Sequence, residues 1–245
     1  MDVRKTIAKN IAKMLKDGDF VNLGIGIPTL VGNYIPEGME VEFHGENGFV
    51  GQNRELDCKD VQTDPVFFRQ WLDTHGGEQT DCYGEEGHRD LINAGGFYIN
   101  LLPGSACFDT SISFIMARGG HLDATVLGGL QVDRHGNLAN WKVPGKKING
   151  MGGAMDLACG AKKVIVAMEH CTKDGQFKIL DDCTMPLTAV GCVDALVTEL
   201  CVIEFRGNGP VVTAMAPGMT PEELQAKTGT KLEFAETIEI MDIVD

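Results

Sequence analysis

The sequence predicts an α/β protein with an open, mostly parallel sheet layered by helices. Short apolar runs recur along its 245 residues, and a strand, a glycine loop and a helix follow one another more than once. Continuous Val and Ile runs, rather than alternating ones, are typical of parallel strands covered on both faces. We expect one domain over residues 1–245, with buried strands at 20–23, 124–129, 163–168, 195–198 and 200–203.

The predicted helices have recognisable ends. Apolar side chains recur at helical spacing from Val3 to Leu15, and Gly18 is suited to end this first helix. After the strand at 20–23 and a glycine loop, a second helical stretch extends to about residue 34. A capping box with proline at the first helical position, 220–223, predicts a short helix that ends at Gly229.

The segment from about Asn53 to His88 differs from its surroundings. It is polar and contains one small apolar island, at 66–71. Such a composition predicts a surface insertion with a short helix, serving as a loop or a subunit contact. We do not expect catalysis there.

The charge balance excludes some partners. A formal net charge of −14 would repel nucleic acid and anionic membranes unless basic residues were gathered in a patch. The densest basic stretch holds only Lys142, Lys146 and Lys147, and it is interpreted as a solvated loop. A phosphate-rich ligand would therefore take some of its cationic contacts from another chain.

The eight cysteines indicate neither a metal site nor a disulfide framework. No pair has C-x-x-C spacing, and the N-terminus lacks a charged segment followed by an apolar signal core. The apolar runs are far shorter than the roughly 20 residues that a membrane span needs. We expect a cytoplasmic protein with reduced thiols and no metal.

The first candidate for chemistry is the Glu46-Asn47-Gly48 motif. Strand-like residues precede and follow it, and glycines on both sides would leave the Glu46 carboxylate accessible on a tight bend. The alternative is a β-hairpin with a type I′ turn, in which Glu46 is merely solvated. The local pattern alone favours that hairpin, because Asn-Gly between apolar runs is the strongest short hairpin signal.

A second candidate is the glycine loop after the first strand. Gly24 and Gly26 lie before a helical stretch, where backbone N–H groups bind phosphate, but the final glycine of the dinucleotide fingerprint and the lysine of a P-loop are both missing. As a nucleotide site the loop is weak. Asn22, at the end of the strand, offers its side-chain amide either to a ligand or to local backbone.

Two further stretches carry paired alternatives. Successive N–H groups in the glycine-dense stretch 149–157 would form an anion nest or an oxyanion hole, or the stretch is a tight strand-to-helix turn that needs positive φ. Glu169 and His170 follow the strand at 163–168. They are either an acid–base pair or hydrogen-bonded structural groups.

Taken together and in this order, these stretches resemble the B (beta) subunit of class I coenzyme A transferases, the 3-oxoacid or acetate/butyrate–acetoacetate CoA-transferase family. Eight blocks in register carry the resemblance, which spans nearly the whole chain. They are VNLGIGIP at 21–28, ENG at 46–48, INAG at 92–95, LPG at 102–104, RGGH at 118–121, LANW at 138–141, GMGGAMDL at 150–157 and MEH at 168–170.

The resemblance implies roles for individual residues. Glu46 would be the nucleophile that attacks an acyl-CoA thioester and then carries CoA as a glutamyl thioester. The amides of Gly153 and Ala154 would bind an oxyanion or contact CoA. Substrate and CoA contacts are also implied at Asn22, beside the CoA thiol, and at Gly24, Gly26, Asn47 and Gly152.

The resemblance also implies the NagB/RpiA-like fold, an A (alpha) subunit as partner in a hetero-oligomer, and coenzyme A as a substrate rather than a tightly bound cofactor. CoA would move from a short-chain acyl-CoA or 3-oxoacyl-CoA to a carboxylic acid by a ping-pong mechanism. Two alternatives stay open: an acyl-CoA hydrolase that uses the same glutamate, and a non-catalytic sugar-phosphate-binding module of the same fold.

The chain departs from the family pattern at two places. Gly45 stands where the family usually has Ser or Thr before Glu-Asn-Gly, which would alter the local support of the nucleophile. The segment at 53–88 looks longer than the corresponding family loop. Neither departure removes the carboxylate of Glu46.

Overall fold

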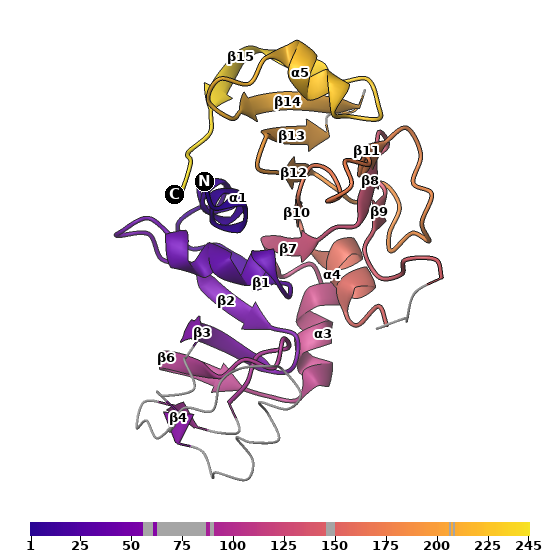
Figure 1. Cartoon of the computed structure of the whole chain (residues 1–245). Coiled ribbons are helices and arrows are strands. Elements are labelled where there is room, and N and C mark those ends of the chain that lie inside the picture. Colours follow the sequence, from indigo (N-terminus) through magenta and orange to yellow (C-terminus); the bar gives the residue numbers. More distant parts are fainter. Residues whose placement is uncertain (56–60, 63–86, 89–90, 146–149, 206, 208) are drawn as a thin grey trace. The chain divides into compact units, whose positions relative to one another are not determined.

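A computed structural model describes the chain except for residues 56–60, 63–86, 89–90, 146–149, 206 and 208 (Figure 1). The described residues form two compact units, which we call unit 1 (residues 1–41 and 114–245) and unit 2 (residues 42–113). The single domain expected over residues 1–245 stays a prediction. The insertion expected at about 53–88, with its short helix, lies mostly outside the described residues.

Unit 1 is built on an open sheet whose strands are mostly parallel, as predicted. The strand order runs from the yellow β15 to the indigo β1 in Figure 1 as β15-β14-β13-β12-β10-β7-β1. The strands are β1 (Phe20–Leu23), β7 (Ala124–Gly128), β10 (Val164–Ala167), β12 (Ala195–Val197), β13 (Cys201–Phe205), β14 (Pro210–Met215) and β15 (Glu233–Ile240). The pairs β1–β7, β7–β10, β10–β12 and β14–β15 are parallel.

One strand of unit 1 differs from the expectation of parallel pairing. β13 runs antiparallel to β12 and to β14. Only residues 198–200 separate β12 from β13, and a parallel crossover needs a dozen residues or more. The apolar composition of 200–203 therefore predicts burial correctly, but the short connection decides the direction.

Helices cover both faces of this sheet. Val164 and Val166 of β10 belong to a buried cluster with Leu157 of α4 (Ala154–Gly160) and Leu224 of α5 (Pro221–Ala226). Ile165 points to the opposite face, because side chains alternate along a strand. On that face α1 (Val3–Ala12) contacts β10 and β12.

The predicted starts of the first and last helices are confirmed, but α1 ends at Ala12, short of the predicted Leu15 and Gly18. The capping box is present at α5, where Thr220 and Glu223 bond each other's backbone, although the helix already ends at Ala226. The second helical stretch is a 3-10 helix, η1 (Ile27–Tyr34). A small separate sheet in unit 1 has the order β11-β8-β9, with β8 (Gln131–Asp133), β9 (Leu138–Ala139) and β11 (Ile179–Leu180).

Unit 2 is antiparallel where unit 1 is parallel. Its strands β2 (Glu42–Gly45), β3 (Phe49–Glu55) and β6 (Ile99–Cys107) pair in that order, each antiparallel to the next. Two short strands, β4 (Val61–Gln62) and β5 (Gly87–His88), form a parallel pair. Helix α3 (Thr110–Arg118) begins in unit 2 and continues into the residues of unit 1.

Candidate active site

The Glu46-Asn47-Gly48 motif forms the turn between β2 and β3. Gly45 pairs with Phe49, so three residues make the loop, and Glu46 is the first of them and partly exposed. Gly48 has φ +119°, and no described residue other than glycine has a positive φ. A type I′ turn needs positive φ at both central residues, so the predicted hairpin is confirmed but its predicted turn type is wrong.

Gly48 is required by its surroundings as well as by its φ. A Cβ built on it would collide with the carbonyl oxygen of Phe108, and the amide of Phe108 donates to the Gly48 carbonyl at 2.9 Å. The turn therefore lies directly against the chain that follows β6. Only glycine fits this close approach.

Side chains and backbone from two other segments hold the remaining turn residues. Thr110 Oγ1, at the start of α3, donates to the carbonyl of Glu46 at 2.8 Å. Asn47 Nδ2 donates to the carbonyl of Ile92 at 2.7 Å. The first bond holds the Glu46–Asn47 peptide through its carbonyl, and the second holds the side chain of the next residue, so both restrain the position from which the Glu46 side chain extends.

The segment that receives Asn47 is itself a tight loop. Asn93, 8% exposed, accepts at Oδ1 from the amides of Gly95 and Phe97 at 2.9 and 3.1 Å. The backbone amide of Asn93 donates to the carbonyl of Phe97 at 2.8 Å. An Asn side chain that satisfies nearby amides in this way stabilises a turn. The INAG block thus supplies a rigid acceptor for Asn47.

In unit 1 the predicted residues of the first glycine loop lie at the end of β1, the strand that pairs with β7. Asn22 is 2% exposed, and Thr125 Oγ1 of β7 donates to its Oδ1 at 3.4 Å. The amide of Gly24 donates to Val126 O at 2.8 Å, and a Cβ on Gly24 would lie 3.0 Å from that oxygen. Gly26 has φ +96° and precedes η1. The loop lies at the carboxyl ends of parallel strands, where α/β sheets commonly bind ligands.

The glycine-dense loop before α4 has the conformation of a tight turn. Gly150 and Gly152 have φ values of +93° and +56°, and Gly153 is the N-terminal cap of α4 without a side-chain cap. The amide of Ala154 donates to Met151 O at 3.4 Å, which is long for a hydrogen bond. Positive φ explains these two glycines, and the oxyanion role stays a prediction.

A cavity of about 580 Å³ lies at the same edge of the unit 1 sheet. Ile27 follows the first glycine loop, Gly128 ends β7, and Met168 and Glu169 follow β10; all four line it. Lys178 also lines the cavity, and burial lowers its pKa while Glu169 acts in the opposite direction. Lys178 could not be predicted as a site residue, because no motif surrounds it and burial of a lysine is a tertiary property.

Most of the chain matches one known protein family. The model described as Coenzyme A transferase matches residues 4–73 and 84–227. The chain belongs to the coenzyme A transferase family. The residues left between the two matched ranges, 74–83, fall within the segment expected to be an insertion.

Individual members of the CoA-transferase family are similar over nearly the whole chain. The beta subunit of acetate CoA-transferase from Escherichia coli K12 is 48% identical over 96% of this chain and 95% of its own length. A mitochondrial succinyl-CoA:3-ketoacid coenzyme A transferase 2A from Rattus norvegicus is 42% identical over 97% of this chain but only 41% of its own length. The fold matches an acyl-CoA transferase apoenzyme from E. coli O157:H7, with TM-score 0.70, 20% identity, and coverage of 98% of this chain and 43% of that one.

In this member of the CoA-transferase family, His170 has the surroundings of a structural residue. It is 1% exposed, its Nδ1 lies 3.1 Å from Thr198 Oγ1, and its Nε2 lies 3.0 Å from Thr228 Oγ1. Burial lowers the pKa of His170 to about 4, and Lys227 and Lys178 act in the same direction. The ring is therefore neutral near pH 7, and the geometry favours hydrogen-bonded structural groups over an acid–base pair.

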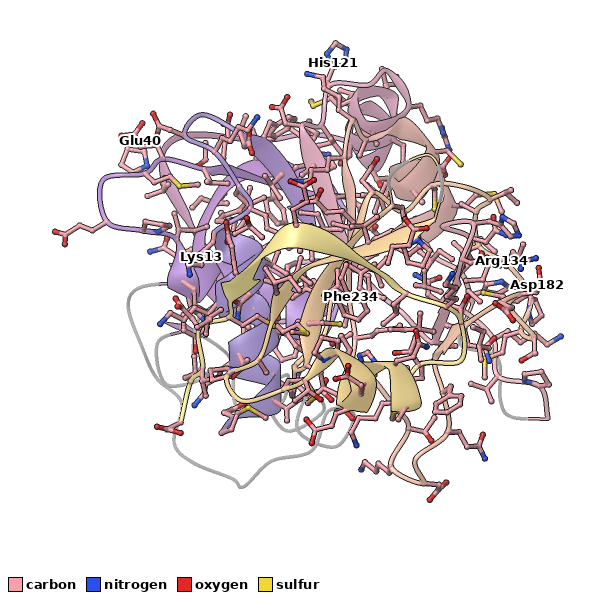
Figure 2. The ribbon with its side chains drawn as sticks, turned by 90° about the horizontal axis from the view of Figure 1, so that it is seen from above. Lys13, Glu40, His121, Arg134, Asp182 and Phe234 are labelled. Carbon is pink, nitrogen blue, oxygen red and sulfur yellow. The ribbon has the colours of Figure 1, made fainter. Side chains whose placement is uncertain are left out.

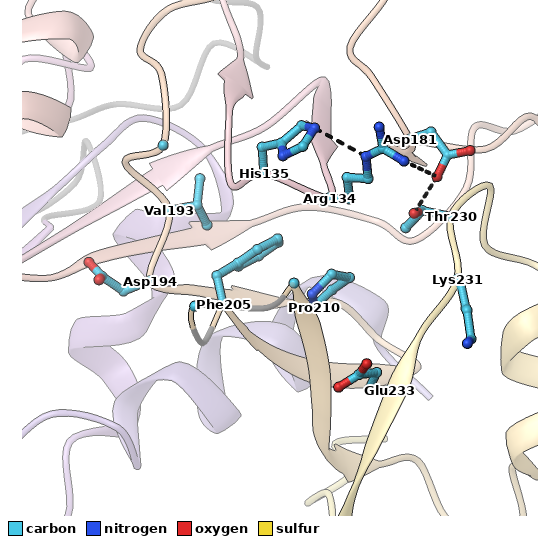
Figure 3. A pocket seen from close by; sticks show the side chains of 13 residues that line it. Arg134, His135, Asp181, Val193, Asp194, Phe205, Pro210, Thr230, Lys231 and Glu233 are labelled. Atoms are coloured by element: carbon cyan, nitrogen blue, oxygen red, sulfur yellow. Dashed lines mark hydrogen bonds and ion pairs between the residues drawn. The ribbon is translucent and has the colours of Figure 1, made fainter.

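A second cavity in unit 1, of about 600 Å³, lies at the opposite edge of the sheet (Figure 3). Asp194 lines it directly before β12, whereas the first cavity follows the end of the parallel strand β10. On its wall Arg134 Nε donates to His135 Nε2 at 3.1 Å, and Thr230 Oγ1 donates to Asp181 Oδ1 at 2.6 Å. In Figure 2 Arg134 and the exposed Asp182 are labelled close together, and Arg134 Nη1 lies 3.9 Å from Oδ1 of Asp181, the residue before Asp182. Charges of both signs line this cavity, and no sequence motif pointed to it.

The predicted site residues are thus distributed over the two units. Glu46 and Asn47 lie in unit 2, and the remaining six lie in unit 1, at the carboxyl edge of the sheet or in the loop before α4: Asn22, Gly24, Gly26, Gly152, Gly153 and Ala154. Of the basic stretch, Lys142 is described, whereas Lys146 and Lys147 lie outside the described residues.

Two features are absent from the described residues: a helix that could cross a membrane and a group of side chains that could hold a metal ion. None of the helices there has the length and apolarity that crossing a membrane requires. Over the same residues, no group of three or more His, Cys, Asp and Glu side chains is arranged to hold a metal ion.

Proposed function

We propose that this chain is the B (beta) subunit of a CoA-transferase that moves CoA from a short-chain acyl-CoA or 3-oxoacyl-CoA to a carboxylic acid, through a glutamyl-CoA thioester on Glu46. One observation carries the proposal: in a chain of this family, Glu46 is the first residue of a turn whose carbonyl groups accept from Thr110 and Phe108 and whose Asn47 side chain donates to Ile92.

The proposed chemistry needs a carboxylate. A Glu46 carboxylate oxygen attacks the thioester carbonyl of the acyl-CoA, which gives an acyl-glutamyl anhydride and CoA thiolate. The thiolate attacks the glutamyl carbonyl, so a glutamyl-CoA thioester forms and the first acid leaves as its carboxylate. A second carboxylate attacks this thioester, and the same two steps in reverse yield the new acyl-CoA and restore Glu46.

An anchored turn suits this chemistry. Each step passes through a tetrahedral oxyanion and requires an attacking atom held close to a carbonyl carbon. A nucleophile on a mobile loop would lose that orientation. Because the backbone around Glu46 is fixed by bonds of 2.7 to 2.9 Å, reorienting the side chain needs rotation about its own χ angles only.

We assign supporting roles to the other predicted residues. The amides of Gly153 and Ala154 are proposed as donors to an oxyanion or to CoA. In this role the Ala154 amide would donate to an acyl oxygen in place of its long bond to Met151. Asn22 is proposed beside the CoA thiol. Additional substrate or CoA contacts are proposed at Gly24, Gly26, Asn47 and Gly152.

The proposed partner is an A (alpha) subunit in a hetero-oligomer. The E. coli K12 relative is named as a beta subunit, and the rat relative has more than half of its length outside the region that this chain matches. In a two-chain enzyme, a second polypeptide would supply that remainder. The net charge of −14 also favours cationic contacts to the CoA phosphates from the partner. Acetate, succinyl-CoA and 3-ketoacids are the first substrates to test, because the relatives are named for them.

The proposal is tested with the chain co-purified with its A subunit. Glu46→Gln removes the nucleophilic carboxylate, and we expect CoA exchange between acetyl-CoA and an acceptor acid to be lost. Glu42→Gln, four residues earlier and exposed at the start of β2, is the matched control and should retain activity. Full activity of Glu46→Gln would exclude the proposed nucleophile. Turnover that is equally fast without any acceptor acid would identify a hydrolase instead.

A further inference from the structure

A buried pair of polar side chains lies directly behind the Glu46 turn. His44 of β2 is 3% exposed, and Ser113 of α3 is fully buried. Ser113 Oγ lies 2.7 Å from His44 Nε2 and 2.8 Å from the carbonyl oxygen of Gly45. Gly45 is the residue immediately before Glu46, so the pair contacts the peptide that leads into the candidate nucleophile.

The direction of the two hydrogen bonds follows from the number of protons. A carbonyl oxygen only accepts, so the single hydroxyl proton of Ser113 points to Gly45 O. The bond between Ser113 Oγ and His44 then requires a proton on His44 Nε2. Burial lowers the pKa of His44, against a hydrogen bond with the Ser113 backbone that raises it, so the ring is neutral near pH 7. Both bonds together select the Nε2–H tautomer.

The carbonyl of Gly45 accepts a second bond, from the amide of Gly48 at 3.0 Å. Its two lone pairs are therefore both occupied, and any rotation of the Gly45–Glu46 peptide breaks both bonds. Such a clamp matters at this position, because glycine has no Cβ to restrict its own backbone. Without Ser113, one of the two restraints on this peptide is gone.

We propose that His44 and Ser113 are positioning residues for the transfer reaction: His44 orients the Ser113 hydroxyl, which fixes the Gly45–Glu46 peptide so that the Glu46 carboxylate meets the thioester carbonyl. This proposal rests on the proposed role of Glu46. Both side chains are buried, so the proposal gives each an effect on the rate through the orientation of the nucleophile rather than through proton transfer.

The test compares three variants of the co-purified enzyme: Ser113→Ala, His44→Leu and His44→Gln. Misplacement of a reacting group by about 1 Å costs on the order of 100-fold in rate, so Ser113→Ala and His44→Leu should lower kcat by about 10- to 100-fold with little change in KM for acetyl-CoA. His44→Gln keeps an N–H donor near the Nε2 position, and it should recover most of the lost kcat.

Thr228→Val is the matched control in unit 1. Thr228 Oγ1 also contacts a buried histidine, His170, and donates to a backbone carbonyl, that of Leu224 at 2.9 Å. Removing this hydroxyl should lower the melting temperature while leaving the kcat of the folded enzyme unchanged. If Ser113 had a purely structural role, Ser113→Ala would likewise lower the melting temperature and leave the kcat unchanged.

The outcomes separate this proposal from the proposed function. If Ser113→Ala or His44→Leu keeps the wild-type kcat while Glu46→Gln is inactive, the positioning role is overturned and the nucleophile stands. If Glu46→Gln remains active, the proposed function itself fails. Should Ser113→Ala not fold, His44→Gln and His44→Leu still decide the matter, because equal kcat values in these two variants would overturn the orienting role of His44.

Discussion

Among the residues whose burial the structure describes, each unit buries one histidine against hydroxyl groups, yet the two arrangements serve different parts of the protein. In unit 2 the hydroxyl beside His44 donates to Gly45, one residue before Glu46. In unit 1 the hydroxyl of Thr228 beside His170 donates to Leu224 at the core side of α5. The same buried chemistry therefore holds a turn in one unit and a helix in the other.

This difference teaches that activity and stability should respond to different changes. The turn of unit 2 is held by a few hydrogen bonds around Glu46, whereas unit 1 packs α4 and α5 against the sheet through a large apolar cluster. We expect changes at the turn to alter the transfer rate more than stability. Changes in the core of unit 1 should do the reverse.

The largest effect on activity, after loss of Glu46 itself, is expected from Gly48→Ala. The added Cβ would collide with Phe108 O, and φ of +119° disfavours any side chain, so the turn must shift and the exchange rate should fall by about 100-fold or more. Gly38→Ala is the matched control, because Gly38 also has a positive φ, of +83°, but open space surrounds the position of an added Cβ. This variant should lose about 1–2 kcal/mol of stability and keep a normal kcat. Equal kcat values for the two variants would contradict the close packing of the turn.

The core of unit 1 should give the largest stability effect. Leu196 of β12 is fully buried in the cluster that includes Leu157 and Leu224. Leu196→Ala leaves a cavity and should lower the free energy of unfolding by about 2–5 kcal/mol, measured by urea denaturation. The kcat of the molecules that remain folded should not change. A large fall in kcat without a change in stability would break the comparison between the units.

A smaller, pH-dependent effect is expected from His170. Its pKa is about 4 in the folded chain, and an unfolded histidine has the ordinary value of 6.5, so the unfolded state binds a proton first as the pH falls. Its contribution to stability is complete above pH 6.5 and is lost between pH 6.5 and 4, by at most about 3 kcal/mol. His170→Gln should flatten the slope of unfolding free energy against pH in this window. Unchanged slopes in the variant would show that other groups, such as the partly buried Glu199, whose pKa burial raises, dominate.

The smallest effect should come from the surface of unit 1. Thr220→Ala removes the side-chain half of the capping box at α5, and a lost cap costs about 1 kcal/mol. The melting temperature should fall slightly, while exchange activity stays at the wild-type value. A loss of activity in this variant would tie α5 to the reaction and blur the distinction between the units.

Much of the fold could be predicted because it depends on local patterns. The all-apolar run of β10 predicts a strand covered on both faces, and the capping box predicts α5. The direction of β13 could not be read from its composition, because chain connection decides it. The position of Glu46 on a hairpin turn was also predictable, since Asn47-Gly48 is a local signal.

The rest of the candidate site depends on contacts between distant residues. The turn type was missed because the loop has three residues, of which Gly48 alone has a positive φ, and because the bonds that hold it come from Phe108 and Thr110, far along the chain. Ser113 and Lys178 carry no sequence signal, since an ordinary serine in a helix and an ordinary lysine before a strand become notable only when buried. Such residues are found from packing and not from motifs.

The central claim is that Glu46 carries CoA covalently, and mass spectrometry of the assembled enzyme tests it most directly. The enzyme is incubated with acetyl-CoA alone, trapped with borohydride or hydroxylamine in parallel samples, digested and analysed. We predict that the untrapped peptide containing Glu46 gains the mass of CoA minus one water, that hydroxylamine converts the residue to a hydroxamate, and that an acceptor acid removes the adduct. An enzyme that exchanges CoA while this peptide stays unmodified in every sample would contradict the account.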